Sequence, residues 1–352
     1  TGVKCTNNRM DPRIRRKASR RRRRRRQRRL AALMITFVVL IGVAATGGVI
    51  IWGQFRNHTA AYEAENYNKN VYQGTLFSSG LCVTTGEVSL DGFSPDTDLH
   101  AAGLFDLEGQ NVLCGYKLFD KVYPASTTKI MTALIALKNG NMDDEVTVSA
   151  HATDFNWDEV TSGLRTGDKV TMYDLLCGLL LHSGNDCGTA IAEHIAGSEE
   201  AFVEMMNEEA AALGATGTHF MNPHGLHDEN HYTTAYDLYL LFNECIKDER
   251  FVEIISMDPY EGTLTGADGT VRKETWTPTQ AYGAGTAKVP DGIRVLGGKT
   301  GTTEKAGNCV ILYDENMAES PYISVIMGAD GVERLYEQMN ALMSAGITGT
   351  SE

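Results

Sequence analysis

The sequence predicts an α+β domain over residues 79–345, preceded by one transmembrane helix at residues 30–52. Strand-like segments gather at both ends of residues 79–345, and helical patterns fill the middle, from residue 126 to about 246. Strands and helices that are separated in this way are typical of a mixed domain rather than of alternating βαβ units. The sequence shows no internal repeat, and the region is long enough for one large domain with a substantial core.

The strand-like segments lie on either side of the helical region. Two of them flank the turn Asp106–Gln110 and predict a hairpin. A helix at Val332–Ala345 is expected to close the domain. The expected strands are Ala101–Phe105, Asn111–Lys117, Arg294–Gly298, Asn308–Tyr313 and Tyr322–Gly328.

The helices are predicted from apolar spacing and end signals. Ile130–Leu137 is apolar on nearly every side, which indicates a buried helix, and Gly140 favours a left-handed end to it. Met172–Leu180 has the i, i+3, i+4 spacing of an amphipathic helix, and a second helical run, Cys187–Ala196, follows at once. A further helix is expected to begin at Thr234, whose hydroxyl can cap the first turn.

The N-terminal region differs sharply in charge from the rest. Residues 1–29 hold 15 of the 32 Lys and Arg residues but one of the 45 Asp and Glu residues, a net charge of +14, so the remainder carries −27. Arg20–Arg26 resembles a nucleic-acid-binding arm, but its position against an apolar segment favours a role in membrane orientation. The acidic remainder argues against binding to nucleic acid.

Residues 30–52 form 23 positions without a charged side chain, about 34 Å of helix, which is enough to cross a bilayer. The segment exceeds a typical signal-peptide core, so we expect an uncleaved signal anchor. The positive-inside rule places the basic tail, residues 1–29, in the cytoplasm and the domain outside the cell membrane, as a single-pass protein. Residues 53–78 are expected to be a juxtamembrane linker, and residues 346–352 a C-terminal tail.

The segment Pro124–Lys129 carries the first chemical motif. Pro124 marks the entrance of the helix, so Ser126 lies on or just before the first turn, where unpaired N–H groups favour a developing anion. Lys129 follows three residues later, on the same face. A lone Ser-x-x-Lys is weak evidence, because a capping serine and a solvated lysine produce the same pattern.

Two later segments add a second and a third motif to Ser-x-x-Lys. Ser183-Gly184-Asn185 occupies a tight loop between two predicted helices, and Lys299-Thr300-Gly301 ends a short β-like segment. Three motifs in this order, on these element types, resemble the serine penicillin-binding enzymes, specifically the low-molecular-mass D-alanyl-D-alanine carboxypeptidases. Gly184 replaces the usual middle Asp. The resemblance covers about residues 79–345 and includes Tyr123–Lys129, Asn222–His227, His231–Thr234 and Gly298–Gly301.

This resemblance implies a β-lactamase/transpeptidase-like fold, with a central, mainly antiparallel sheet, flanking helices and an all-helical lobe. It implies that Ser126 forms the acyl-enzyme, that Lys129 is its base and that Ser183 relays a proton. Asn185 would orient the substrate, and Lys299 and Thr300 would bind its carboxylate. The N–H groups of Ser126 and Thr302 would form the oxyanion hole, and Gly301 is also implied to bind the substrate. The implied substrate is the peptidoglycan stem peptide, β-lactams are implied inhibitors, and no cofactor is implied.

Other functions with the same residues stay open from the sequence alone. A D,D-endopeptidase or a β-lactamase would use the same site, although no Glu-x-x-Leu-Asn motif, which supplies the deacylating glutamate of class A β-lactamases, lies between Asn185 and Lys299. A non-catalytic β-lactam sensor or wall-binding protein would be acylated without cleaving peptide. For Lys129 to act as a base it must be neutral, and burial together with the charge of Lys299 would lower its pKa.

Three further patterns have weaker interpretations. His224, His227 and His231 could ligate zinc, but Pro223 and Gly225 indicate a turn, which favours a loop-ordering role. Gly292–Thr300 nearly matches a P-loop, with one residue too many before the Gly-Lys pair. The seven cysteines show no disulfide framework; Cys82–Cys114 and Cys177–Cys187 are conceivable pairs, and free buried thiols are at least as consistent with the spacing.

Overall fold

The computed structural model describes residues 28, 30–34, 36, 37 and 79–347. The chain divides into two units, Thr1–Phe77 and Ser78–Glu352. In the first unit the described residues are helical, and the Thr36 hydroxyl donates to the Ala32 carbonyl over 2.9 Å. Most of the predicted membrane segment lies outside the described residues, and within those described no helix has the length and apolarity to cross a bilayer.

The second unit is built on a five-stranded antiparallel sheet, ordered β2-β1-β9-β8-β7. The predicted α+β class with antiparallel strands is confirmed, and β1 and β2 form the predicted hairpin. The strand predicted at Arg294–Gly298 is longer than expected, because β7 continues through the third motif. The strands are β1 (Ala101–Asp106), β2 (Asn111–Tyr116), β7 (Ile293–Thr303), β8 (Gly307–Asn316) and β9 (Pro321–Ala329).

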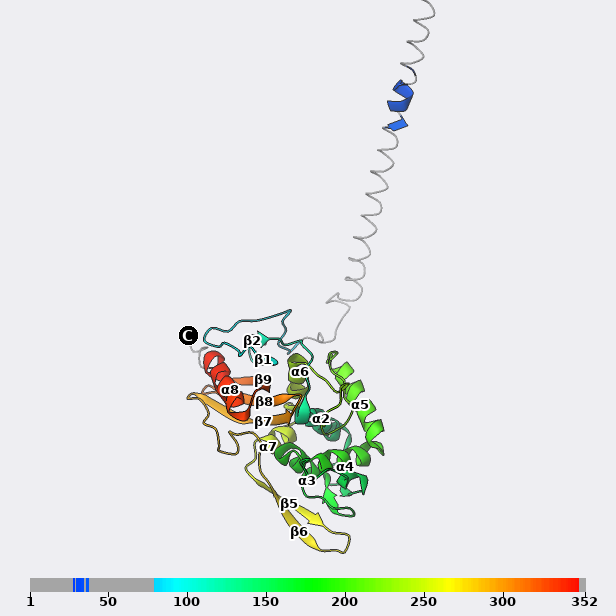
Figure 1. Ribbon diagram of the computed structural model, residues 1–352, viewed down its shortest axis with the longest axis vertical. Helices are drawn as coiled ribbons and strands as arrows, with labels where there is room; N and C mark the ends of the chain where they lie inside the picture. The colour runs from blue at the N-terminus through cyan, green and yellow to red at the C-terminus, as the bar shows by residue number, and fades with distance from the viewer. Residues whose placement is uncertain (1–27, 29, 35, 38–78, 348–352) are drawn as a thin grey trace, which may run out of the picture. The chain divides into compact units, whose positions relative to one another are not determined.

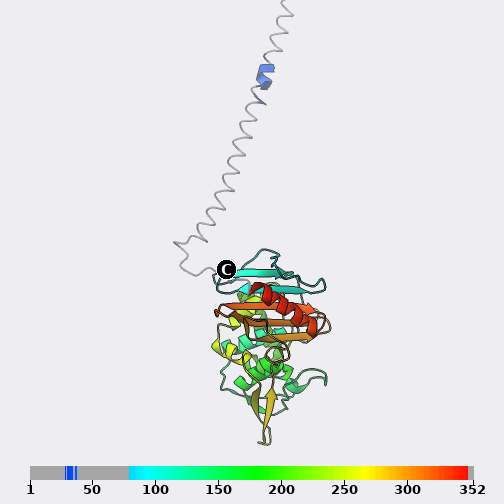
Figure 2. The same ribbon diagram turned by 90° about the vertical axis from the view of Figure 1, so that its left-hand side faces the viewer.

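Helices cover both faces of this sheet (Figures 1 and 2). On one face, α8 (Val332–Gly346) packs Leu335, Met339 and Leu342 against alternate residues of β8 and β9 such as Leu312. On the other face, the intervening residues of the same strands join a larger core with the helical lobe. Because both faces are covered, β9 is apolar almost throughout and β8 is apolar from Cys309 to Tyr313.

The helical lobe carries the first two motifs. The predicted buried helix is α2, which ends at the predicted place, although Gly140 has an extended conformation (φ −95°, ψ 153°) rather than a left-handed one. Thr234 caps α6 as predicted, accepting a hydrogen bond from the Asp237 N–H over 3.0 Å. The lobe contains α2 (Lys129–Asn139), α3 (Met172–Cys177), α4 (Asn185–Ala196), α5 (Glu199–Ala212), α6 (Ala235–Cys245) and α7 (Glu249–Ile255).

A second, four-stranded antiparallel sheet was not predicted from the sequence. Its strands β5 and β6 form a hairpin that extends from the lobe (Figure 1). Three consecutive charged residues on β6, Arg272–Glu274, leave no apolar run or apolar alternation that would predict a strand. The strands are β3 (Glu145–Thr147), β4 (Lys169–Thr171), β5 (Tyr260–Thr265) and β6 (Val271–Trp276).

Candidate active site

Ser126 lies in a short 3₁₀ turn, η1 (Ala125–Thr128), directly before α2. The turn is conformationally demanding, because Ala125 has a positive φ of 48°. It is also tightly enclosed. A Cβ atom at Gly301 of β7 would lie 2.9 Å from the Ser126 nitrogen, and one at Gly225 would overlap the Ala125 carbonyl. Two glycines therefore let a sheet strand and a distant loop close around the serine.

Lys129 is fully buried beside this serine. Its Nζ lies 3.0 Å from Ser126 Oγ, 2.8 Å from Asn185 Oδ1 and 2.6 Å from the carbonyl oxygen of His224. Burial first, and then the positive charge of Lys299, hold the pKa of Lys129 well below its usual value. The structure thus combines the lowered pKa that a general base requires with contact to a serine hydroxyl.

Ser183 forms a second pair with Lys299. The predicted helix Met172–Leu180 is α3 followed by a π-helical turn, η3 (Gly178–His182), which delivers Ser183 in the left-handed conformation at φ 68°. Lys299 is also fully buried and donates from Nζ to Ser183 Oγ over 2.9 Å and to the Thr300 carbonyl over 3.0 Å. Burial lowers the pKa of Lys299 to about 7.

The loop that carries Ser183 is held by Asp186, a residue that the sequence analysis missed. The buried Asp186 carboxylate accepts hydrogen bonds from the N–H groups of Ser162, Leu164 and Cys187 at 2.8–3.0 Å. The Ser162 side chain fills the space that a Cβ atom at position 184 would need, which explains why Gly follows Ser183 here. The signal in the sequence that could have identified Asp186 is its position in the first turn of α4, where an acidic side chain is favoured.

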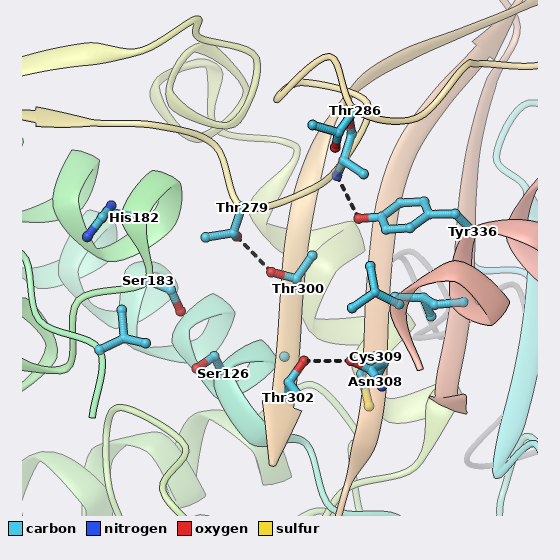
Figure 3. Close-up of a pocket in the computed structure, with 15 residues that line it drawn as sticks. Ser126, His182, Ser183, Thr279, Thr286, Thr300, Thr302, Asn308, Cys309 and Tyr336 are labelled. Carbon is cyan, nitrogen blue, oxygen red and sulfur yellow. Dashed lines mark hydrogen bonds between the residues drawn. The ribbon is translucent and has the colours of Figure 1, made fainter. Parts of the chain in front are cut away.

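A cavity of about 340 Å³ opens over these groups (Figure 3). Five predicted residues line it: Ser126, Ser183, Thr300, Gly301 and Thr302. The other three, Lys129, Asn185 and Lys299, are buried behind this surface. Lys129 contacts Ser126, and Lys299 contacts Ser183. Asn185 lies one step further back and contacts Lys129. All eight predicted site residues are therefore brought together. His182, Thr279, Thr286 and Tyr336 also line the cavity and were not singled out from the sequence.

Comparison with known proteins identifies the family. The model of peptidase family S11, described as D-alanyl-D-alanine carboxypeptidase, matches residues 93–331. The chain belongs to this family. Its sequence is 40% identical over 154 residues to the D-alanyl-D-alanine carboxypeptidase DacF of Bacillus subtilis, covering 42% of this chain and 39% of the relative. It is 30% identical over 269 residues to DacC of Escherichia coli, covering 72% of this chain and 62% of that protein.

The fold of this chain is similar to that of solved structures with the same described activity. A solved structure of the D-alanyl-D-alanine carboxypeptidase from Mycobacterium tuberculosis aligns with a TM-score of 0.64 and 26% sequence identity, covering 74% of this chain and 96% of that one. The chain spans 39% and 62% of the lengths of the two curated relatives, so its match to them covers part of each protein.

In this family S11 member, the three histidines order the loop against the serine. His231 Nε2 donates to Thr128 Oγ1 over 2.8 Å, while its Nδ1 accepts from the Met221 N–H over 3.2 Å. His224 supplies its backbone carbonyl to Lys129, and His227 packs edge-on against Tyr123 at 4.7 Å between ring centroids. The zinc alternative is not supported, because both ring nitrogens of His231 already bind protein groups.

The P-loop alternative is wrong, because Gly292–Thr300 leads into and along strand β7, and Lys299 points into the interior. Neither conceivable disulfide is formed. Cys82, Cys114, Cys177 and Cys187 are buried free thiols, as are Cys245 and Cys309. Cys82 donates instead to the Asp106 carbonyl over 3.2 Å. Burial raises the pKa of Cys82 to about 11 and that of Cys114 to about 12, which keeps both thiols protonated and unreactive.

Proposed function

We propose that this chain is a serine-type D-alanyl-D-alanine carboxypeptidase, which removes the terminal D-alanine of peptidoglycan stem peptides through an acyl-enzyme on Ser126. One observation carries the proposal: Ser126 Oγ lies 3.0 Å from the Nζ of a fully buried lysine with a lowered pKa. Family membership gives the substrate class, since the family is described as D-alanyl-D-alanine carboxypeptidase.

The hydrogen bonds of Lys129 explain how it acts as a base. Asn185 Oδ1 and the His224 carbonyl can only accept hydrogen bonds, so each takes one N–H of the amine. A neutral amine has two N–H groups, and its lone pair then points to the third neighbour, Ser126 Oγ. In this form Lys129 removes the hydroxyl proton while the serine oxygen attacks the peptide carbonyl.

The second pair completes the cleavage. As the peptide C–N bond breaks, Ser183 donates its hydroxyl proton to the departing amine of D-alanine and recovers a proton from the Lys299 ammonium, 2.9 Å away. Lys129 releases to water the proton that it took from Ser126, and Lys299 takes one proton up from water, so both amines return to their starting states. A pKa of about 7 suits Lys299 to proton exchange near neutral pH. Asn185, held through its oxygen by Lys129, presents its amide nitrogen to the substrate.

The remaining site residues, Thr300, Gly301 and Thr302, follow Lys299 on β7. Lys299 and Thr300 bind the terminal carboxylate. The N–H groups of Ser126 and Thr302 stabilise the oxyanion, and each such donor typically contributes about 3 kcal/mol to the transition state. Two features support this assignment: β7 is the outermost strand of its sheet, and Gly301 allows the strand to approach the Ser126 nitrogen.

We also propose that residues 30–52 anchor the enzyme in the bacterial cell membrane, with residues 1–29 in the cytoplasm and the catalytic domain outside. The uncharged length of this segment and the +14 net charge before it support the anchor. Protease treatment of intact spheroplasts tests the orientation. Digestion should remove the domain, and full protection of the domain would contradict the proposal.

Mass spectrometry tests the catalytic proposal directly. Incubation with a stem pentapeptide should yield the tetrapeptide and D-alanine, and incubation with benzylpenicillin should leave a slowly released adduct on the peptide that contains Ser126. The Ser126→Ala variant should show neither product. Full carboxypeptidase activity in Ser126→Ala would show that Ser126 is not the nucleophile. Rapid turnover of penicillin would instead indicate a β-lactamase, and adduct formation without peptide cleavage would indicate a sensor.

A further inference from the structure

We infer that Thr279 is a specificity-determining residue: it closes one end of the cleft and limits the leaving residue to the size of D-alanine. The inference rests on the proposed function and concerns a question that the sequence left open, the choice between terminal D-alanine and a cross-linked residue as the leaving group.

Thr279 crosses the cleft between its two walls. Its backbone N–H donates to the carbonyl of Leu181 over 3.1 Å, on the turn that carries Ser183. Its Oγ1 lies 2.7 Å from Thr300 Oγ1 on β7. Figure 3 shows Thr279 between the helical turn with His182 and the strand with Thr300. The two walls that hold the reacting groups are therefore joined by one residue at this end.

The crossing is anchored on both sides, so it forms a fixed wall. Before it, the buried Trp276 donates from Nε1 to the Ser162 carbonyl over 3.0 Å. After it, the Ala281 N–H donates to the Tyr336 hydroxyl over 2.7 Å, which fixes the segment to α8. Gln280 is buried and accepts from the Gly283 N–H over 2.9 Å. Thr279 itself is exposed, and it lines the cavity.

This wall meets the substrate at its leaving residue. In the proposed complex the terminal carboxylate binds Lys299 and Thr300, so the residue that carries it lies beside Thr279, which contacts Thr300 directly. The methyl group of D-alanine needs little room there. The leaving residue of a peptidoglycan cross-link carries a long side chain, which would meet the side chain of Thr279. The geometry therefore favours release of a terminal D-alanine over cleavage of cross-links.

A series of leaving residues tests the wall. The substrates are diacetyl-L-lysyl-D-alanyl peptides that end in D-alanine, D-norvaline or D-norleucine, and the quantity compared is kcat/KM within each protein. The wild type should prefer D-alanine over D-norleucine by about 10- to 200-fold or more, the range set by one methylene in a tight pocket. Thr279→Ala removes the γ atoms and should lower this preference by about tenfold.

Thr279→Val is the matched control, because it keeps the bulk and loses the hydroxyl. It should retain the preference for D-alanine. Because each preference is a ratio within one protein, a partly unfolded variant does not change it. Equal preferences in the wild type and Thr279→Ala, or no preference in the wild type, would overturn the inference. Failure of the wild type to release any terminal residue would instead overturn the proposed function.

Discussion

The two serine–lysine pairs of this molecule are alike in contact and different in surroundings. In both, a fully buried Nζ lies about one hydrogen bond from a serine hydroxyl: 3.0 Å for Lys129 and Ser126, 2.9 Å for Lys299 and Ser183. The first pair is three residues apart in the chain, whereas the second is 116 residues apart. Contact alone therefore does not assign a base and an acid.

The surroundings separate the two roles. Lys129 contacts two oxygens that only accept hydrogen bonds, and its pKa is lowered by burial and by the charge of Lys299. The pKa of Lys299 is lowered by burial alone, to about 7. One lysine is thus held neutral to remove a proton, while the other exchanges protons near neutral pH.

The largest effect should come from removing the base. Lys129→Met keeps the length of the side chain and abolishes proton transfer, so the rate of acylation by benzylpenicillin should fall by about 10²–10⁴-fold. Stopped-flow acylation measures the rate, and circular dichroism checks that the variant is folded. A folded variant that acylates within a factor of a few of the wild type would mean that another group deprotonates Ser126.

Removing the second lysine should change the pH dependence. The positive charge of Lys299 lowers the pKa of Lys129, so Lys299→Met should raise it. Since Lys129 acts when deprotonated, the acid limb of the kcat/KM profile for a pentapeptide should move to higher pH. The carboxylate also loses a ligand, so KM should rise. An acid limb at the wild-type position would show that the two amines are not electrostatically coupled.

The two pairs differ in how well the sequence predicts them. The local pair could be placed from the sequence, because Pro124 and the apolar run fix Ser126 and Lys129 on one helix turn. The contact of Ser183 with Lys299 depends on the packing of a sheet strand against the helical lobe, and its place at the site came from resemblance to a family. Thr279 was missed, because its contacts with Leu181 and Thr300 join segments that are distant in the chain. The acidic residue at the start of α4 was visible, but its bonds to the distant Ser162 and Leu164 N–H groups were not.

A smaller effect should follow from filling the space behind the second pair. A Cβ atom at Gly184 would overlap the Ser162 hydroxyl, although the backbone of Gly184 (φ −62°, ψ 124°) suits any residue. Gly184→Ala should therefore destabilise the domain by about 1–3 kcal/mol through overpacking and displace Ser183.

The double variant Ser162→Gly, Gly184→Ala provides the control, because it removes the nearer of the two obstructing side chains and leaves Asp186 Oδ1 at 2.6 Å from the added Cβ. It should recover part of the lost stability in urea unfolding, as well as part of the acylation rate. Independent, additive losses in the double variant would show that the steric conflict is not the cause.

A third buried serine–charge pair lies on the α8 side of the sheet and has no part in the site. Asp314 is fully buried and accepts a short hydrogen bond from Ser324, while its Oδ1 has no hydrogen-bond partner among the described residues. The nearby Tyr282 hydroxyl donates to Asn340 instead, over 2.7 Å. Burial therefore raises the pKa of Asp314 to about 7.

The stability that this raised pKa contributes is full below the pKa of the unfolded side chain, near 3.8, and is lost as the pH rises through about 7. Asp314→Asn stays neutral throughout. It should raise Tm by about 2–8 °C at pH 8 and change it little at pH 4, with unaltered acylation at both. A lower Tm at pH 8 would mean that the ionised carboxylate is stabilised in the fold. Unlike the two lysines, whose protonation states serve the chemistry, Asp314 is a buried titratable group that we expect to affect stability alone.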